Sequence, residues 1–506
     1  MKIKLWKSRH ERLKFISAGF ANSTELFFGN KTMKYEATIG LETHIMQKTD
    51  SKMFCACKYE YGAEPNIHVC PVCLGYPGAL PVMNEKAIEL CCKAGLLLDC
   101  KINPYSKWDR KNYFYPDMAK NYQITQADEP LCLGGHLTVD VDGETKTFTL
   151  ERIHQEENAA KNTHVAGASL VDYNRAGTAL MEIVSNPCMH SSADALAYLT
   201  ALKQIMEYGG ISDCNPEKGQ IRSDVNVSVR PVGQKELGSK VEIKNMNSFA
   251  FIQQAIEYEI ERQIELLESG GLVVQETRGF DADRGETFSQ RTKENAHDYR
   301  YFPEPDLMPV KVSTEQVEQW RAELPELPAQ RRVRYVAELG LPEYDAGVLT
   351  ADKATSDWFE QTMQYTKNAK AVSNFIMGEM MRLLSEQHLL IADSKVTPEK
   401  LAQIIALIDA KTISTGAGKQ VFEIIFNDGG DPKSIVEEKG LAQVSDDSAL
   451  EGWADEAIAN NPKPVEEYKA GNPASINFLM GQVMKASRGK ANPAAVMQML
   501  KQKLDG

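Results

Sequence analysis

Four cysteines near the amino terminus have the spacing of a zinc site. The segment IGLETHIMQKTDSKMFCAC, residues 39–57, ends in Cys55 and Cys57, and VCPVC adds Cys70 and Cys73 after twelve intervening residues. Two short thiolate pairs brought together by a hairpin are typical of zinc ribbons, in which four sulfurs bind Zn²⁺ and leave no open position. The spacing therefore predicts a structural zinc ion, the alternative being four reduced cysteines placed at this separation by chance.

The remaining cysteines lack the spacing of metal ligands. Ten cysteines in a chain of 506 residues do not indicate a secreted disulfide framework. We expect the other six to be buried thiols that pack in the core: Cys91, Cys92, Cys100, Cys132, Cys188 and Cys214.

Acids and histidines alternate with apolar residues in several predicted strands. Residues two apart in a strand share a face, so in ATIGLETHI the side chains of Glu42 and His44 lie opposite those of Leu41 and Ile45. Similar polar residues occur in RIHQEEN, ALMEIV, IRSDVNVSVR and KVEIKN: His154, Glu156, Glu157, Glu182, Arg222, Asp224, Asn226, Ser228, Arg230, Glu242 and Lys244. A sheet face of this composition is unusual for a surface that only meets water.

Such a face suits phosphoryl transfer. Carboxylates with one imidazole can hold Mg²⁺, which bridges nucleotide phosphates, while arginine and lysine neutralise developing charge. A single glutamate is more often solvated or salt-bridged than a ligand, so the hypothesis rests on the joint pattern. STGAGKQ is not a phosphate-binding loop, because Ile413 replaces its first glycine and Gln420 its Ser/Thr. A nucleotide would have to bind without a P-loop.

The strands and helices that position these residues can be predicted from the sequence pattern, which indicates an α+β domain followed by helical modules. Period-2 alternation indicates strands at 34–45, 136–154, 223–231 and 239–246, and helical patterns that end at glycines span 192–210 and 248–271. After the proline-rich ELPELP the pattern is helical, and NDGGDP marks a second boundary. We predict an α+β domain over 33–320, a helical domain over 321–432 and a small helical tail over 433–506.

Net charge and hydropathy indicate which partners the protein can bind and where it is located. The net charge of −13 has the wrong sign for a protein that coats nucleic acid. Near the carboxyl end, however, five basic residues cluster with no acidic residue between them: Lys485, Arg488, Lys490, Lys501 and Lys503. No apolar run approaches the ~18 residues of a membrane helix, so we expect a cytoplasmic protein with no membrane partner. Residues 1–32 are expected to be a loose extension, or Met33 the true start.

Long motifs from Met33 to the carboxyl terminus resemble the B subunit of the aspartyl/glutamyl-tRNA(Asn/Gln) amidotransferase family. The resemblance is carried by IGLETH, SKMF, CPVCLGYPGALPVMN, KWDRKNYFYPDMAKNYQITQ, DYNRAGTALMEIVSNP, GQIRSDVNVSVRP, VEIKNMNSF and DYRYFPEPDL. It implies a glutamine-synthetase-like cradle, a helical domain and a tail that helps to hold tRNA. Residues 1–32 fall outside it.

The resemblance also implies an activity. The B subunit would bind misacylated Glu-tRNA(Gln) or Asp-tRNA(Asn) and phosphorylate the side-chain carboxylate with ATP and Mg²⁺. Ammonia released from glutamine by the amidase, or A, subunit would then displace phosphate, and the small C subunit would brace this heterotrimer. The chain would thus act as an ATP-dependent carbon–nitrogen ligase with glutamine as the amido donor. The sequence leaves open which misacylated tRNA is the substrate.

Site residues follow from the same resemblance. The catalytic and Mg²⁺-binding positions of the family fall on Glu42, His44, Glu156 and Glu157. Positions for ATP or the 3′ end of tRNA fall on Arg175, Glu182, Arg222, Asp224 and Lys244, and those of the tRNA-binding tail on Lys485, Arg488 and Lys490. Where the family has HMEEDAGK this chain has HQEENAAK, so that Asn158 replaces an acid and Ala160 a glycine. The cysteine quartet occurs in only part of the family, which fits a structural brace.

Two other classes of function compete with this interpretation. A zinc-bearing RNA-binding module without chemistry would place carboxylates away from phosphate, which the acid-lined strands argue against. A free-standing ammonia ligase for a small carboxylic acid would need its own glutaminase, and neither an amidase-type glycine loop nor a nucleophile-elbow cysteine is present in the sequence. A requirement for misacylated tRNA in ATP hydrolysis would distinguish them.

Overall fold

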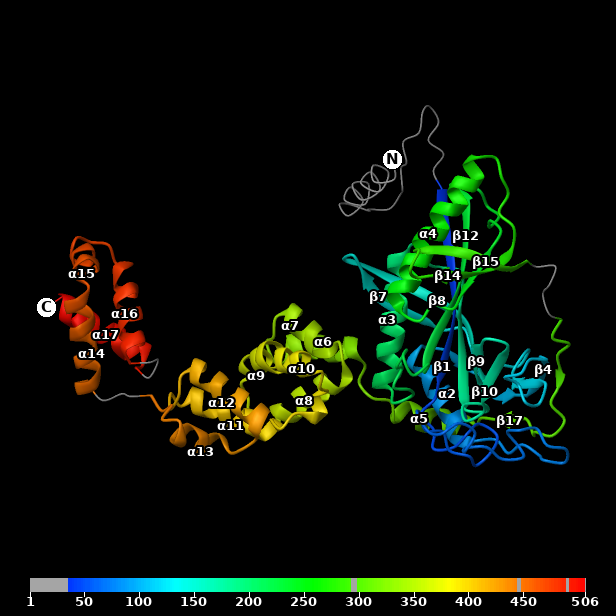
Figure 1. Ribbon diagram of the computed structural model, residues 1–506, viewed down its shortest axis with the longest axis horizontal. Helices are drawn as coiled ribbons and strands as arrows, with labels where there is room; N and C mark the ends of the chain where they lie inside the picture. Colours follow the sequence, from blue (N-terminus) through cyan, green and yellow to red (C-terminus); the bar gives the residue numbers. More distant parts are fainter. Residues whose placement is uncertain (1–34, 293–297, 444–446, 488–490, 506) are drawn as a thin grey trace. The chain divides into compact units, whose positions relative to one another are not determined.

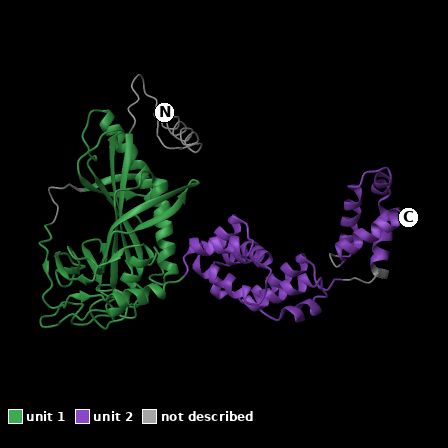
Figure 2. Cartoon of the chain, turned by 180° about the vertical axis from the view of Figure 1, so that it is seen from behind, with its two compact units in different colours: residues 1–325 green, residues 326–506 purple. Residues whose placement is uncertain are grey.

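The computed structural model describes residues 35–292, 298–443, 447–487 and 491–505 (Figure 1). The predicted extension at residues 1–32 lies outside the described residues. The chain divides into two compact units, residues 1–325 and 326–506 (Figure 2). The first contains the strands and the second is helical, which confirms the predicted α+β class with a helical carboxyl-terminal part.

A ten-stranded sheet forms the centre of the first unit. Eight of the nine pairings between its strands are antiparallel, and β13 and β14 run parallel. In spatial order the strands are β15 (Glu286–Thr292), β14 (Glu276–Asp281), β13 (Val241–Lys244), β12 (Ile221–Pro231), β1 (Tyr35–Met46), β11 (Ala179–Ser185), β8 (Glu144–Glu157), β6 (Cys132–Leu133) and β2 (Lys101–Ile102), with β7 (His136–Val141) also paired to β8.

The apolar face of this sheet packs against helices. Leu41 and Val227 are at most 1% exposed, and Ile252 and Ile256 of α4 are at most 2% exposed. The covering helices are α2 (Glu85–Leu97), α3 (Ser192–Tyr208) and α4 (Phe249–Glu268). The side chains of Ser191 and Ser248 cap α3 and α4 by accepting a backbone N–H three residues on, which fixes where each helix begins. The predicted helices at 192–210 and 248–271 are confirmed.

The predicted hairpin at 136–154 is confirmed as β7 and β8. Asp142 and Gly143 join the two strands with φ angles of 52° and 86°, and the right-handed twist of a two-residue hairpin favours such positive values. The hairpin matters for the site because β8 continues beyond β7 and pairs residues 154–157 with β11.

Smaller sheets and an irregular segment flank the large sheet. Residues 47–84, all within the described part of the chain, contain no helix or strand. The smaller sheets comprise β4 (Asp109–Asn112) with β5 (Tyr122–Thr125) and β16 (Phe302–Pro303), β9 (Lys161–Val165) with β10 (Ala168–Asp172), and β3 (Tyr105–Ser106) with β17 (Val310–Lys311). Helix α5 (Thr314–Ala322) follows the last strand.

The helical unit contains two separate hydrophobic cores. The first extends from Tyr335 to Val436 and the second from Leu450 to Leu504. Helix α13 therefore packs in the first core, although the sequence places a boundary at its start. The helices are α6 (Pro328–Ala337), α7 (Glu343–Thr350), α8 (Lys353–Met363), α9 (Ala369–Phe375), α10 (Met381–Gln387), α11 (Pro398–Asp409), α12 (Thr415–Asp428), α13 (Pro432–Glu438), α14 (Asp447–Asn460), α15 (Pro462–Lys469), α16 (Ser475–Ala486) and α17 (Pro493–Asp505).

Most of the cysteines outside the quartet are core thiols, as predicted. Five of the six are buried, whereas Cys188 is half-buried and points its sulfur at the carbonyl of Thr149, 3.7 Å away. The prediction is wrong for Cys188 because it lies in the turn between β11 and α3, near the rim of the sheet.

One buried carboxylate ties α4 to the edge of the sheet. Glu259 is 0% exposed and accepts hydrogen bonds from Arg262 Nη2 (2.6 Å) and Thr287 Oγ1 (3.0 Å). Its Oε2 also lies 3.5 Å from Nε of Arg278, whose other acidic partner is Glu276. A buried carboxylate with two arginines is costly to remove because the cations keep their desolvation penalty.

We predict that Glu259→Ala lowers the free energy of unfolding by about 3 kcal/mol or more, since Glu276 is then the only described carboxylate left to pair with the two guanidiniums. Urea denaturation of the full chain measures this change. The control is Glu265→Ala, an exposed position on the same helix, where we expect less than about 0.5 kcal/mol. Equal effects at the two positions would contradict the assignment.

Candidate active site and metal centre

Four neighbouring strands place polar side chains in a row across the sheet. His154 of β8 pairs with Glu182 of β11, Glu182 with His44 of β1, and His44 with Arg222 of β12. Directly paired residues of antiparallel strands point to the same face. Glu156, two residues after His154, shares that face because strand side chains alternate. The register therefore brings together residues that are distant in the sequence.

The first group of possible metal ligands, which we call the His44 cluster, consists of His44, Glu156 and Glu182. One ligand atom from each lies within 4.8 Å of the others. Nε2 of His44 is 3.3 Å from Oε1 of Glu156 and 3.6 Å from Oε2 of Glu182. His154 lies behind the cluster, with its Nε2 3.2 Å from Oε2 of Glu182. Glu156 is 2% exposed, so these charges are largely removed from water.

The His44 cluster balances buried charges of opposite sign. Burial disfavours the charged imidazole of His44, but the hydrogen bond and charge of Glu156 outweigh it and raise the pKa of His44. Burial likewise opposes ionisation of Glu182, yet His154 and His44 hold the pKa of Glu182 well below its usual range. A divalent cation between these groups would replace the imidazolium charge that now offsets the two carboxylates.

A second group, the Glu42 cluster, consists of Glu42, Asp224 and Glu242 on the same face. Its ligand atoms also lie within 4.8 Å of one another, and Glu42 pairs with Asp224 in the register of β1 and β12. Lys244 Nζ lies 2.6 Å from Asp224 and 2.9 Å from Glu242, and Asn226 donates to Glu42 (2.9 Å). Burial and the nearby charge of Glu182 raise the pKa of Glu42, so this carboxylate lacks enough positive charge nearby.

An open pocket adjoins the Glu42 cluster. Its volume is ≈ 410 Å³, and Thr38, Glu42, Asn226, Ser228 and Pro187 contribute to its walls. This volume lies within the range of small-molecule sites, and mixed polar and apolar walls can hold a ring system while orienting its polar atoms.

Glu157 does not lie with these groups. It follows Glu156 on β8 and therefore points to the opposite side of the sheet. There it forms an ion pair with Lys120 and accepts a hydrogen bond from the backbone N–H of Ile124 (2.9 Å). The structure thus brings Glu182, predicted as a binding residue, to His44 and Glu156. It places Glu42 in the neighbouring cluster on the same face and Glu157 on the opposite face.

Two arginines, Arg222 and Arg175, lie beside the clusters. Arg222 is exposed, and Arg175 donates to the carbonyl oxygens of Ala159 (3.0 Å) and Ala160 (2.9 Å). Burial and the charge of Arg222 lower the pKa of Arg175, while the carboxylates of Asp117 and Asp172 act in the opposite direction. Among the described residues neither guanidinium forms an ion pair with an acid, and adjacent guanidiniums of this kind suit phosphate oxygens.

Asn158 lies where the resemblance leads one to expect an acid. Its Oδ1 is 3.3 Å from Nη2 of Arg222, while its buried Nδ2 has no hydrogen-bond partner. An aspartate here would form an ion pair with Arg222, so the amide leaves that guanidinium without an anionic partner at this position. Ala160 is 1% exposed and its methyl group is accommodated in the fold.

Sequence reasoning missed Lys111. This lysine is in β4, and the carboxylates of Glu156 and Glu182 raise its pKa despite burial, which disfavours its charge. It therefore adds a permanent cation beside the His44 cluster. Its strand consists of the four residues DRKN, which are too few to show alternation in the sequence.

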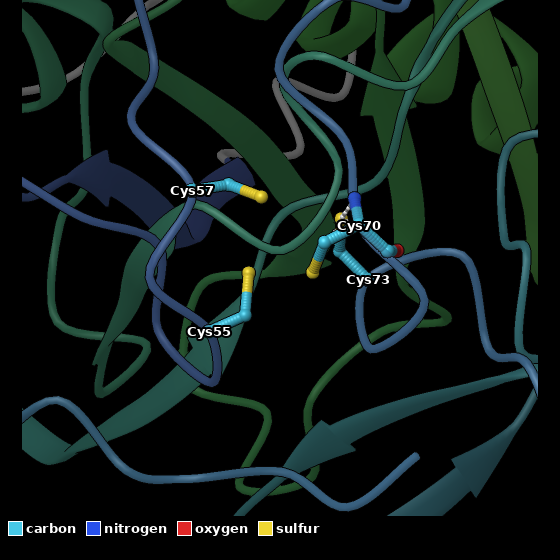
Figure 3. Close-up of side chains that lie close together, drawn as sticks. All are labelled: Cys55, Cys57, Cys70 and Cys73. Carbon is cyan, nitrogen blue, oxygen red and sulfur yellow. Dashed lines mark hydrogen bonds between the residues drawn. The ribbon is translucent and has the colours of Figure 1, made fainter. Parts of the chain in front are cut away.

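The four cysteines converge as predicted. Their Sγ atoms lie within 4.8 Å of one another, and Figure 3 shows them pointing into one space from two loops. Burial raises the pKa of Cys57 to about 11, whereas the hydrogen bond with Cys55 lowers the pKa of Cys73 to about 4. The N–H of Cys70 donates to Cys73 Sγ (3.2 Å), a contact typical of a metal-binding thiolate. Four sulfurs without an open position fit a structural Zn²⁺.

The cysteine loop, residues 47–84, supports the segment that carries Arg175. Lys52 Nζ lies 3.6 Å from Cys73 Sγ and donates to the carbonyl of Tyr173 (3.1 Å). The N–H of His68 donates to Asn174 (2.8 Å), and Asn66 binds the backbone of Val171. An ion on the four sulfurs would therefore also fix the position of Arg175 indirectly.

The predicted basic tail is only partly described. Lys485 of α16 and Lys501 of α17 are exposed, whereas Lys503 pairs with Glu451 (2.9 Å) and Asp455 (2.7 Å). Arg488 and Lys490 lie outside the described residues. Nowhere in the described ranges is a helix long and apolar enough to span a membrane.

Comparison with known proteins identifies the family. The sequence model of the "GatB/GatE catalytic domain" matches residues 37–318, and that of the "GatB domain" matches residues 357–504. The chain is 52% identical over 473 residues to the B subunit of the aspartyl/glutamyl-tRNA(Asn/Gln) amidotransferase of Persephonella marina, a match that covers 93% of this chain and 100% of that relative. The B subunit of Trichlorobacter lovleyi is 53% identical over 475 residues, 94% of this chain and 100% of the relative. The chain therefore belongs to the family of aspartyl/glutamyl-tRNA(Asn/Gln) amidotransferase B subunits.

Proposed function

We propose that this chain activates the side-chain carboxylate of misacylated Glu-tRNA(Gln) or Asp-tRNA(Asn) with ATP and transfers ammonia to it. The ammonia would come from glutamine through an amidase subunit, and a third, small subunit would brace the assembly in the cytoplasm, where tRNA is used. One observation carries the proposal: two carboxylate clusters lie next to each other on one sheet face, beside two arginines that form no ion pair with an acid in the described part of the chain. The names of the relatives supply the substrate class.

The two clusters fit divalent cations. The His44 cluster offers one imidazole and two carboxylates, and the Glu42 cluster offers three carboxylates, which suits Mg²⁺ or Mn²⁺ better than soft metals. The sequence predicted one Mg²⁺ on Glu42, His44, Glu156 and Glu157; we now propose two sites, with Glu182, Asp224 and Glu242 as further ligands and without Glu157. Bound Mg²⁺ would screen the repulsion between the substrate carboxylate and the γ-phosphate.

The chain's own cations would complete this screening. Arg222 and Arg175 would bind phosphate oxygens, since neither forms an ion pair with a described carboxylate. Lys111 would face the substrate at the His44 cluster, and Lys244 would hold Asp224 and Glu242 in place. The pocket of ≈ 410 Å³ beside Glu42 would accept the nucleoside, so that its phosphates point along the sheet toward both clusters.

A binding module without chemistry explains these features less well. Carboxylates repel RNA phosphates, and the acids of the two clusters, gathered on one face, would weaken binding of nucleic acid unless cations occupy the clusters. The tail would contribute to tRNA binding through exposed lysines such as Lys485, together with Arg488 and Lys490.

We predict that Glu42→Gln and Glu156→Gln each lower kcat for tRNA-dependent release of phosphate from ATP by about 10²-fold or more, because each removes a metal ligand needed in the transition state. His44→Ala is expected to be milder, since oxygen ligands remain. The assay uses the assembled complex and misacylated tRNA.

The matched control is Glu144→Gln, an exposed glutamate at the other end of the same strand as Glu156. It should keep normal activity. Near-normal rates for both Glu42→Gln and Glu156→Gln, in protein that folds normally, would show that the carboxylates are structural.

Asn158→Asp is expected to raise the KM for ATP by about three- to tenfold with little change in kcat, since the new carboxylate would pair with Arg222 and compete with phosphate. Steady-state kinetics at several ATP concentrations measures this. Asn162→Asp, which adds the same charge on the β9 strand, should leave KM unchanged. An unaltered KM for Asn158→Asp would remove Arg222 from the phosphate site.

Elemental analysis of protein purified without chelator should find one zinc per chain. Cys70→Ser should lose the zinc and lower stability, with proteolysis appearing in residues 58–82, because a loop without secondary structure depends on the ion. Cys188→Ser, a half-buried cysteine away from the quartet, should retain the zinc. Absence of zinc from the wild-type protein would refute the site.

A further inference from the structure

Exposed aromatic side chains gather on two segments next to the His44 cluster. In the first unit large rings such as Trp108 and Tyr198 are at most 1% exposed, as expected of core residues. By contrast, Phe114 is 87% exposed and Tyr301 is 48% exposed. We call the surface made by Tyr113, Phe114, Tyr115, Tyr299 and Tyr301 the aromatic strip.

Hydrogen bonds hold the two segments of the strip side by side. Asn112, directly before Tyr113, donates its backbone N–H to the carbonyl of Tyr299 (3.0 Å) and its side chain to the carbonyl of Arg300 (2.7 Å). Two residues after Arg300, Phe302 pairs with Arg110 in the ladder of β16 and β4. The rings then contact within each segment, Tyr113 with Tyr115 (5.9 Å between centroids) and Tyr299 with Tyr301 (6.1 Å).

The strip adjoins the carboxylate clusters. Strand β5, which pairs with β4, is fixed to the end of β8: Gln123 Nε2 donates to the carbonyl of Glu157 (2.7 Å), and the Ile124 N–H donates to its carboxylate (2.9 Å). Lys111 connects the two regions, since its Nζ lies 4.8 Å from the Tyr299 ring centroid while its charge interacts with Glu156.

Aromatic rings interleaved with cations are the usual surface for unpaired nucleotides. Every base can stack on a ring whatever its sequence, and nearby lysine or arginine binds the phosphates. Lys111 and the exposed Arg300 supply those charges here. In an aminoacyl-tRNA the amino acid is attached to the last of several unpaired nucleotides, so a surface next to the activating carboxylates must hold them.

We propose that the aromatic strip binds the unpaired 3′ nucleotides of tRNA, with bases stacked on Phe114 and Tyr301. The inference rests on the proposed function for the identity of the RNA. It assigns the positioning of the aminoacyl end to the segments 113–115 and 299–301, apart from the basic tail and from the metal ligands.

The test measures affinity of the full-length chain for two RNA hairpins, one ending in an unpaired ACCA-3′ and one blunt. The tailed hairpin should bind roughly tenfold more tightly or better. Phe114→Ala and Tyr301→Ala should each weaken its binding roughly tenfold and leave the blunt hairpin unaffected, while Tyr301→Phe keeps the ring and the affinity. Tyr365→Ala, at a 59% exposed tyrosine of the helical unit, serves as control and should change nothing.

Equal binding of the two hairpins, no binding of either, or normal binding by both alanine variants would overturn the proposal. Alanine variants that keep RNA affinity but fail to assemble with partner subunits would mark the strip as a protein contact instead. No ATP, metal or aminoacyl group is present in this experiment, so failure here leaves carboxylate activation untouched. Conversely, Glu156→Gln should bind the tailed hairpin normally even where it blocks phosphate release.

Discussion

Repulsion among carboxylates on one sheet face is the constraint around which the first unit is built. The register of β8, β11, β1 and β12 gathers Glu156, Glu182, Glu42 and Asp224 there, and a one-residue slip would drive them into the apolar core. Histidines and a lysine lie beside these carboxylates, and the raised pKa of Glu42 shows that its negative charge is not fully compensated. Negative charge that is not fully compensated favours the binding of metal ions and of the cations that accompany phosphate.

Separate elements of the first unit position further residues beside this face. The loop of four cysteines positions the segment that carries Arg175, although it has no helix or strand of its own. The small sheet of β4, β5 and β16 brings Lys111 and the aromatic strip to the end of β8. A few hydrogen bonds would thus link the structural metal, the phosphate-binding arginines and the nucleotide-stacking rings. The stability of the loops would therefore affect the geometry of the site.

The sequence predicts what depends on local spacing and misses what depends on register. The convergence of the four cysteines could be predicted because each Cys pair is local in the sequence, and the shared face of Glu42 and His44 follows from alternation. The position of Glu157 next to Glu156 in the sequence was misleading, because neighbouring residues of a strand point to opposite faces. Its contact with Lys120 shows this. The partnership of Glu182 with His44 required the pairing of β11 with β1, which no local pattern specifies.

The central claim is that the polar face binds divalent cations. Crystals of the protein soaked in Mn²⁺ and measured for anomalous scattering test it most directly. We expect a peak between His44 Nε2 and the carboxylates of Glu156 and Glu182, a second among Glu42, Asp224 and Glu242, and loss of the first in Glu156→Gln. Absence of both peaks from this face, or a first peak that persists unchanged in Glu156→Gln, would contradict it.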